Sequence, residues 1–330
     1  MSGTGNTTIG IANFATPYAG FAGFYFTVMK HPPHLFNSIS ELHKALGLPK
    51  PLHPLISLVD YSQISADTTE IEKGMVFNFY KISYKRDFSG KVKYGQNYYD
   101  FDEGGLSFFA PRQLITASGD EADYGGYTLL VHPDFIRNHA LGKNIADYGF
   151  FAYAVNEALY LSAREKEVIT GIFVNIETEL NSAIDSVSQD VLVSQVELLL
   201  NYSKRFYNRQ FITRKSANNE LLSRFEQLLA NSFGEVNLAK NGVPGVSDLS
   251  SQLNVSPHYL SDMLRTITGQ NTQQHIHNKL IEKAKELLST TGLSVAEVAY
   301  KLGFEHPQSF NKVFKRMTEM TPVEFRRSFN

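Results

Sequence analysis

A pattern of two short helices is written twice near the end of this chain, and it limits the possible folds more than any other feature. The first copy occupies residues 249–265 and the second occupies residues 298–315. In each copy, apolar residues four apart predict a first helix with one buried stripe, and a proline marks the start of a second helix. Asn254 and Gly303 stand at matching positions between the helices, and both residue types readily take the left-handed conformation of a tight turn.

The second helix of each copy is predicted to bury one apolar pair, Leu260 with Leu264 or Phe310 with Phe314, and to expose its polar face. This geometry is a helix-turn-helix, whose second helix can enter a DNA major groove. An ordinary helical hairpin with a solvated polar face is the alternative, but two copies with similar outer faces favour DNA binding. The outer faces hold His258, Ser261, Asp262 and Arg265 in the first copy, and Gln308, Ser309, Asn311, Lys312 and Lys315 in the second.

The stretch between the copies, residues 272–288, carries apolar residues at helical spacing. It predicts a helix that would hold the two recognition helices rigidly. Two helices held in this way can read successive major-groove faces, about 34 Å apart along B-form DNA.

Residues 221–328 resemble the DNA-binding domain of the AraC/XylS family of bacterial transcription regulators. The resemblance is carried by the run GFEHPQSF at 303–310, by Phe314-Lys315-Arg316, and by TPVEFR at 321–326. It implies two helix-turn-helix units in one chain that bind asymmetric DNA sites. By position it places base contacts at His258, Ser261 and Asp262 in the first unit, and at Gln308, Ser309 and Lys312 in the second.

Asp262 departs from the long basic or amide side chain that is common at its position in this family. A carboxylate there can accept a hydrogen bond from cytosine N4, but it repels phosphate. We therefore expect the second unit to make the more dependable base contacts. Arg326 and Arg327 follow its recognition helix, in a segment better placed for phosphates.

The chain has 330 residues, enough for two domains, and no cysteine. The lack of cysteine excludes disulfides, cysteine–zinc sites and thiol chemistry. The net charge of −2 would not by itself identify a DNA-binding protein. Residues 1–29 contain no charge, and the run 9–29 is long enough to span a bilayer. Polar residues and glycines dilute that run and no basic residue precedes it, so we interpret it as an extension.

Strand signals dominate residues 55–132, with alternating apolar residues and many glycines. They predict a small antiparallel β-barrel or jelly roll. Residues 55–135 resemble the cupin-like sensor domain of AraC-family regulators, through FFAP at 108–111 and LVHPDF at 130–135. An effector pocket inside this barrel is predicted, lined by Phe77, Phe79, Tyr80, Phe108 and Phe109, although these aromatic residues could equally be plain core.

Cupin enzymes hold a metal through clustered histidines and a glutamate on adjacent strands. In this chain no His-x-His with a nearby Glu falls among the predicted strands. We therefore predict no metal, no cofactor and no enzymatic activity. The alternative is a cupin-type enzyme that carries the DNA-binding domain only for localisation.

Two helices with apolar stripes follow, over residues 165–181 and 191–209. Both stripes can cover the barrel, and a pair of long amphipathic helices can also form a dimer surface. The residues predicted for dimerisation are Ile169, Phe173, Ile176, Leu180, Val196, Leu199 and Leu200.

The predicted fold is therefore of the α+β class: a cupin-like antiparallel β-barrel with a helical dimerisation hairpin, then an all-α domain with two helix-turn-helix units. We predict a cytoplasmic transcription regulator that binds double-stranded promoter DNA as a homodimer, with a small-molecule effector and RNA polymerase as further partners. The predicted divisions are an extension at 1–34, a sensor domain at 35–160, a helix pair at 161–210, a linker at 211–220 and a DNA-binding domain at 221–330.

Overall fold

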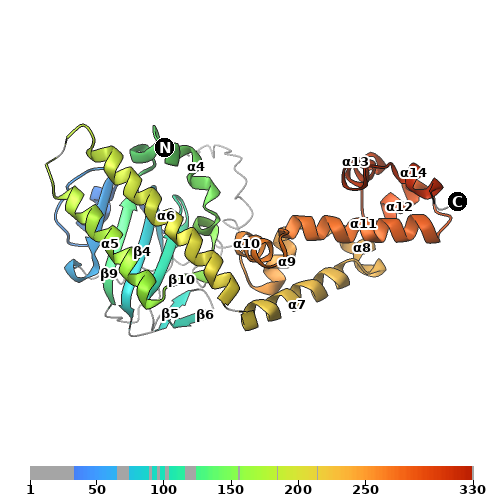
Figure 1. Cartoon of the computed structure of the whole chain (residues 1–330), viewed down its shortest axis with the longest axis horizontal. Helices are drawn as coiled ribbons and strands as arrows, with labels where there is room; N and C mark the ends of the chain where they lie inside the picture. The colour runs from blue at the N-terminus through green and yellow to red at the C-terminus, as the bar shows by residue number, and fades with distance from the viewer. Residues whose placement is uncertain are drawn as a thin grey trace, which may run out of the picture.

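The chain combines an N-terminal part of sheets and helices with a C-terminal part made of helices alone (Figure 1). The computed structural model describes residues 33–64, 74–88, 91–94, 97–100, 104–115, 124–154, 157–183, 185–213 and 215–328. The apolar run at 9–29 lies outside these residues. Among the helices described, none has the length and apolar character needed to cross a bilayer.

A five-stranded antiparallel sheet forms the centre of the N-terminal part. Its strand order is β10-β7-β4-β9-β2. These strands are β2 (Ile56–Asp60), β4 (Tyr80–Phe88), β7 (Gly105–Phe109), β9 (Tyr124–Val131) and β10 (Leu159–Tyr160). Neighbouring residues of a strand point to opposite faces, so Phe108 and Phe109 enter different hydrophobic clusters on the two sides of the sheet.

Two long helices, α5 (Ala163–Leu180) and α6 (Ser188–Thr213), cover one face of this sheet (Figure 1). The ring of Phe173 on α5 stacks on Tyr84 and on Tyr127 of the sheet, with centroids 5.6 and 5.7 Å apart. The Tyr84 hydroxyl also hydrogen-bonds Thr170 on the same helix. The apolar stripe of α5 is therefore buried against residues of the same chain.

The other face carries a smaller sheet, in the order β1-β3-β8, and a short helix α2. A separate hairpin of β5 and β6 and several short helices complete this part. The remaining bounds are β1 (His34–Phe36), α2 (Ile39–Ala45), η1 (Tyr61–Gln63), β3 (Met75–Phe77), β5 (Lys91–Tyr94), β6 (Asn97–Asp100), β8 (Leu114–Ile115), α3 (Pro133–Ile136), α4 (Ala140–Asn144), η2 (Ile145–Asp147) and η3 (Gly149–Ala152).

The prediction of a closed barrel is wrong for the residues that the structure describes. There the strands form open sheets, and the five-stranded sheet ends at β10 on one side and at β2 on the other. The run 75–84, predicted as one strand, is divided into β3 and β4 at Asn78 and Phe79. β3 pairs with β8 in the three-stranded sheet, and β4 pairs with β7 in the five-stranded sheet. The two halves of the run therefore belong to two separate open sheets.

The C-terminal part begins directly after α6, with α7 starting at Lys215. The predicted linker at 211–220 therefore falls mainly on the end of α6 and the start of α7. The helices are α7 (Lys215–Ser232), α8 (Glu235–Asn241), α9 (Val246–Leu253), α10 (Pro257–Thr268), α11 (Thr272–Thr290), α12 (Val295–Lys301), α13 (Pro307–Thr318) and α14 (Pro322–Arg327).

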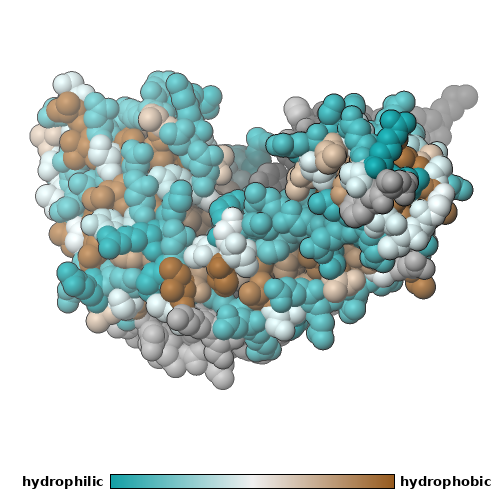
Figure 2. Space-filling model, turned by 45° about the vertical axis from the view of Figure 1, so that its right-hand side comes forward, coloured by the Kyte–Doolittle hydropathy of each residue, from teal (hydrophilic) through white to brown (hydrophobic). Residues whose placement is uncertain are grey.

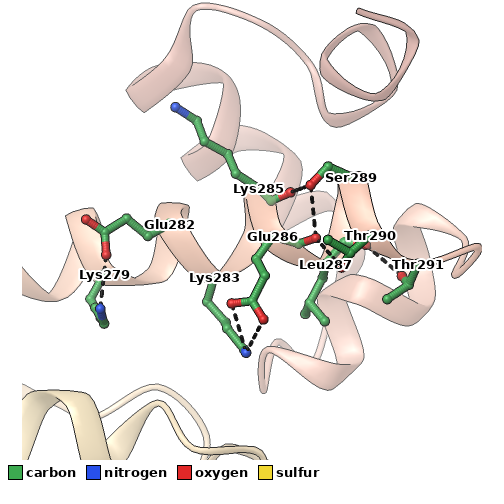
Figure 3. A network of polar contacts seen from close by, with 9 residues as sticks. All are labelled: Lys279, Glu282, Lys283, Lys285, Glu286, Leu287, Ser289, Thr290 and Thr291. Carbon is green, nitrogen blue, oxygen red and sulfur yellow. Dashed lines mark hydrogen bonds and ion pairs between the residues drawn. The ribbon is translucent and has the colours of Figure 1, made fainter. Parts of the chain in front are cut away.

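The helix α11 joins the two repeated units, α9–α10 and α12–α13, as predicted (Figure 1). Its inner stripe, which includes Ile276, Leu280 and Ala284, is fully buried. On its outer side Lys279 pairs with Glu282 and Lys283 pairs with Glu286, while Ser289, Thr290 and Thr291 bond carbonyls of the last turns (Figure 3). These contacts support a straight, stable spacer between the units.

Candidate nucleic-acid interface

The second unit presents an open recognition helix at the end of the molecule farthest from the sheets (Figure 1). Helix α13 starts with Pro307 and buries only Phe310 and Phe314 completely. Its predicted contact residues Gln308, Ser309, Asn311, Lys312 and Lys315 are all exposed. A duplex can therefore reach amide, hydroxyl and ammonium groups on one face of this helix. In the view of Figure 2 the surface over the C-terminal helices is largely hydrophilic.

The turn before α13 depends on a close backbone approach. Gly303 has φ +82°, and a Cβ there would lie 2.6 Å from the Cα of Gly242. Only glycine fits both the left-handed conformation and this contact. The approach fixes the second unit against the end of α8, and it leaves a shallow groove whose wall includes Ser309 and His306.

The two arginines that follow α13 have different surroundings. Arg326 is half-buried and its Nε donates to the carbonyl of Leu288 at the end of α11, 3.1 Å away. Arg327 is exposed. We therefore assign Arg326 to holding α14 on α11, where a cation also complements the helix dipole. The prediction of a phosphate contact is compatible with the exposure of Arg327, while Arg326 is engaged within the chain.

The first unit has the predicted backbone but a partly covered face. Asn254 takes the left-handed conformation (φ 59°), Ser256 caps α10, and Pro257 begins it. Of the predicted contact residues, His258 and Arg265 are exposed. Ser261 is half-buried and its hydroxyl hydrogen-bonds Thr272 at the start of α11, so it links two helices.

Asp262 is held by two partners within the chain. It pairs with Arg265 one turn along α10, with 2.7 Å between Nη1 and Oδ1. Its Oδ2 accepts a hydrogen bond from the Tyr153 hydroxyl, also at 2.7 Å. Tyr153 belongs to the N-terminal part, directly after η3. The side chain predicted to read a base is thus engaged by another domain.

Glu157 makes a second contact with α10 and was not among the predicted site residues. Its two carboxylate oxygens accept from the backbone N–H and the hydroxyl of Ser256, at 2.6 and 2.5 Å. The same carboxylate accepts from the N–H of Ala154. The aromatic ring of Tyr259 packs between Tyr153 and Phe211 of the N-terminal part. No local sequence pattern marks Tyr153 and Glu157 as partners of α10, because they lie about a hundred positions before it in the chain.

Burial raises the pKa values of the ionisable groups at this contact between the two parts. It raises the pKa of the Glu157 carboxyl from 4.5 to about 6, against the opposing effect of the hydrogen bonds from Ser256 and Ala154. Burial, followed by the charge of Asp262, raises the pKa of the Tyr153 phenol, which therefore stays protonated at neutral pH. Burial likewise raises the pKa of Tyr207.

The five aromatic residues predicted to line an effector pocket do not surround one cavity. Phe77, Phe79 and Phe109 lie in the cluster between the two sheets, whereas Phe108 and Tyr80 pack in the cluster beneath α5 and α6. A cavity of about 10 Å³, room for a single water, borders Phe108 and Tyr153. The described residues contain no group of three or more side chains suited to a metal ion.

The residues predicted for dimerisation lie mostly in the core of the chain itself. All except Leu180, which is half-buried, are nearly inaccessible, because α5 and α6 turn these stripes toward the sheet and toward each other. The outer faces of these helices carry exposed Val174, Val191 and Leu198 instead. A dimer formed through this helix pair would have to use these outward residues.

Comparison with known proteins matches residues 249–328 to the family described as "Helix-turn-helix domain". The region is an AraC-type helix-turn-helix domain. The chain is 31% identical over 109 residues to the "Uncharacterized transcriptional regulatory protein YesN" of Bacillus subtilis (strain 168), which covers 32% of this chain and 28% of that protein. It is 29% identical over 168 residues to the "HTH-type transcriptional activator RhaR" of Enterobacter sp. (strain 638), which covers 50% of this chain and 56% of that protein.

Among solved structures, the chain is similar to the C-terminal domain of the two-component response regulator yesN from Fusobacterium nucleatum subsp. nucleatum. Its identity is 32% over 31% of this chain and 93% of that domain, with a TM-score of 0.28. The chain spans less than two thirds of the curated relatives named above. The predicted family of the C-terminal part is confirmed, and the relatives are transcription regulators.

Proposed function

We propose that the chain is a sequence-specific DNA-binding regulator of transcription. The observation that supports this most strongly is the AraC-type domain, whose second recognition helix exposes five polar side chains on one face while burying Phe310 and Phe314. A helix with that division can lie in the major groove without exposing its core.

The chemistry of the α13 face suits base reading at one end and backbone binding at the other. The Gln308 amide stands in the first turn and can bond adenine N6 and N7 together. Lys312 lies one turn further on and can donate to guanine O6 or N7. Lys315 and Arg327 add exposed positive charge for phosphates, which position the helix without reading sequence.

The remaining partners extend this proposal. We infer that the N-terminal part senses a small-molecule effector, that the protein acts as a homodimer on promoter DNA together with RNA polymerase, and that it works in the cytoplasm, where bacterial DNA lies. The similarity to regulators supports a role without enzymatic activity. The exposed outer face of α5 and α6 is the surface of this part that a second copy could use.

The test is a selection followed by titration. The full chain is used to enrich duplexes from a random-sequence library, and its affinity for an enriched duplex and for a shuffled duplex is measured at several salt concentrations. We expect the enriched duplex to bind at least about a thousandfold more tightly, with affinity falling steeply as salt rises. A folded chain that enriches no sequence and binds no duplex at low salt would contradict the proposal.

A further inference from the structure

The two recognition helices differ in how open they are, although their sequences predict equivalent roles. The predicted contact residues of α13 are exposed, whereas α10 lies against η3 and α6 of the N-terminal part. In Figure 1, α10 is adjacent to the sheet-bearing part, and α13 stands at the far end of α11.

The covered side of α10 is the side predicted to meet DNA. An atom placed at the Cβ position of Gly149 in η3 would lie 2.6 Å from Oδ2 of Asp262 and 3.9 Å from Nδ1 of His258. The space in front of Asp262 is therefore filled by protein, while His258 beside it keeps an exposed surface. A base pair cannot occupy that space at the same time.

We infer that the N-terminal part is an autoinhibitory partner of the first recognition helix, and that Tyr153 and Glu157 are the residues that hold α10 away from DNA. This inference rests on the proposed DNA binding. In the docked arrangement α13 is open for base contacts, whereas Asp262 of α10 is covered by the N-terminal part. Full use of both units requires α10 to leave η3.

The polar contacts between the N-terminal part and α10 are suited to reversible docking of this helix. Tyr153 donates one hydrogen bond to Asp262, and Glu157 accepts two from Ser256 at the start of α10. A carboxylate at a helix N-terminus takes the place that a DNA phosphate could occupy. The groups of α10 that docking ties up, on Ser256 and Asp262, are thus ones that DNA can pair with instead, and opening returns Tyr153 and Glu157 to water.

The docking contact between Tyr153 and α10 is connected to the interior of the N-terminal part. Tyr153 borders the small cavity that Phe108, Phe150 and Tyr207 also line. Its ring contacts Tyr207 on α6 and Tyr259 on α10, edge to face. Tyr153 therefore connects the lining of this cavity directly to Asp262 of α10.

The test compares two tyrosine variants of the same segment. Tyr153→Phe keeps the ring and removes only the hydroxyl that binds Asp262. Tyr148→Phe removes a hydroxyl that binds Asn201 on α6 and does not touch α10. With a duplex enriched by the full chain, we expect Tyr153→Phe to bind about tenfold more tightly, since the binding-competent fraction rises, and Tyr148→Phe to match the wild type. Unchanged or weaker binding by Tyr153→Phe, in a chain that melts as the wild type does, would overturn the inference.

A steric pair of variants tests the same contact without removing any hydrogen-bonding group. Gly149→Ala puts a methyl where Asp262 now lies, whereas Gly171→Ala, on α5, meets nothing within 4 Å. We expect Gly149→Ala alone to tighten DNA binding, and equal affinities for both variants would count against the hold. If even the wild-type chain binds no duplex, the proposed function fails. If it binds and either Tyr153→Phe or Gly149→Ala does not bind more tightly, the autoinhibition fails.

Discussion

Individual side chains on the C-terminal domain divide into those that face solvent and those that hold the domain together. Ser261 and Arg326 were predicted to contact DNA, yet Ser261 bonds Thr272 and Arg326 bonds the Leu288 carbonyl. Gln308, Lys312 and Arg327 keep their side chains exposed. Roles in DNA reading therefore remain best supported for the second unit.

Reading and positioning can be separated within that unit. Gln308→Ala should cost about 1–3 kcal/mol on an enriched duplex and relax discrimination at one base pair, because a bidentate amide contact is lost. Arg327→Ala serves as the control: it should weaken all duplexes alike and lower the salt slope by about one unit. The measurement is a binding titration on the enriched site, its single-base variants and random DNA. An equal loss on every duplex for Gln308→Ala would mean that the amide contacts the backbone.

The raised pKa of Glu157 predicts a pH effect with a definite sign. The docked carboxyl has a pKa of about 6 against 4.5 when solvated, so the docked state binds the proton more tightly. Docking is therefore favoured as pH falls through 6, and weakened as pH rises above it. From pH 7 to pH 5 the docking equilibrium should strengthen about eightfold. The neighbouring phenols Tyr153 and Tyr207 remain protonated across this range, since burial raises the pKa of each.

The measurement is the ratio of DNA affinities of wild type and Glu157→Gln at pH 7 and pH 5. Taking the ratio removes the titration of histidines common to both chains. We expect the wild type to lose affinity relative to Glu157→Gln at the lower pH. A ratio that does not change with pH would show that Glu157 is not titrating in the docked state.

At the scale of elements, the repeated units follow from local chemistry. Each second helix begins at a proline and each turn contains a left-handed residue, and Asn254 and Gly303 have φ of 59° and 82°. A position can require glycine because its φ is positive or because a neighbouring backbone leaves no room for a Cβ. Gly303 and Gly269 allow these two causes to be compared. Both have positive φ, but only Gly303 also meets a neighbouring backbone.

We expect Gly269→Ala to destabilise the chain by about 1 kcal/mol, from its conformation alone. Gly303→Ala should cost about 3 kcal/mol, because its Cβ would also collide with the Gly242 backbone. Chemical denaturation of the full chain, with α-helical circular dichroism as the signal, measures both. Similar losses for the two variants would indicate that the turn at Gly303 moves away from Gly242 at little cost.

The elements that sequence predicted well are those whose boundaries are set within a few residues. The helices α5, α6, α10, α11 and α13 were predicted from apolar spacing and caps. The apolar stripe of α5 did not reveal what covers it, and Phe173 proved to stack on the sheet instead of meeting a second chain. Division of the run 75–84 between two sheets depends on pairing with β8 and β7, which local alternation does not encode.

At the scale of the whole molecule, the hydrophobic cluster beneath α5 and α6 continues into the helices of the C-terminal part. Tyr153, Phe211 and Tyr259 join the two parts. A contact such as Tyr153–Asp262, between positions far apart in the chain, has no sequence signature. This contact docks α10 on the N-terminal part, so that the helix is no longer fully accessible to DNA.

The spacing of the two units sets how the chain would lie on DNA. Helix α11 has 19 residues. At 1.5 Å per residue it is about 28 Å long, close to the repeat of about 34 Å between successive major-groove faces. With α10 released, both recognition helices can therefore enter one face of the same duplex, about 10 base pairs apart.

The most direct test of DNA reading by two units is a guanine-methylation protection footprint of the Gly149→Ala chain, whose α10 is expected to be released from η3, at saturation on an enriched duplex. Two protected major-groove segments are expected, about 10 base pairs apart on one face of the helix. The Gln308→Ala variant should weaken protection in one segment and leave the other in place. A single protected segment at saturating protein, or protection that does not depend on sequence, would contradict a chain that reads DNA through two helix-turn-helix units.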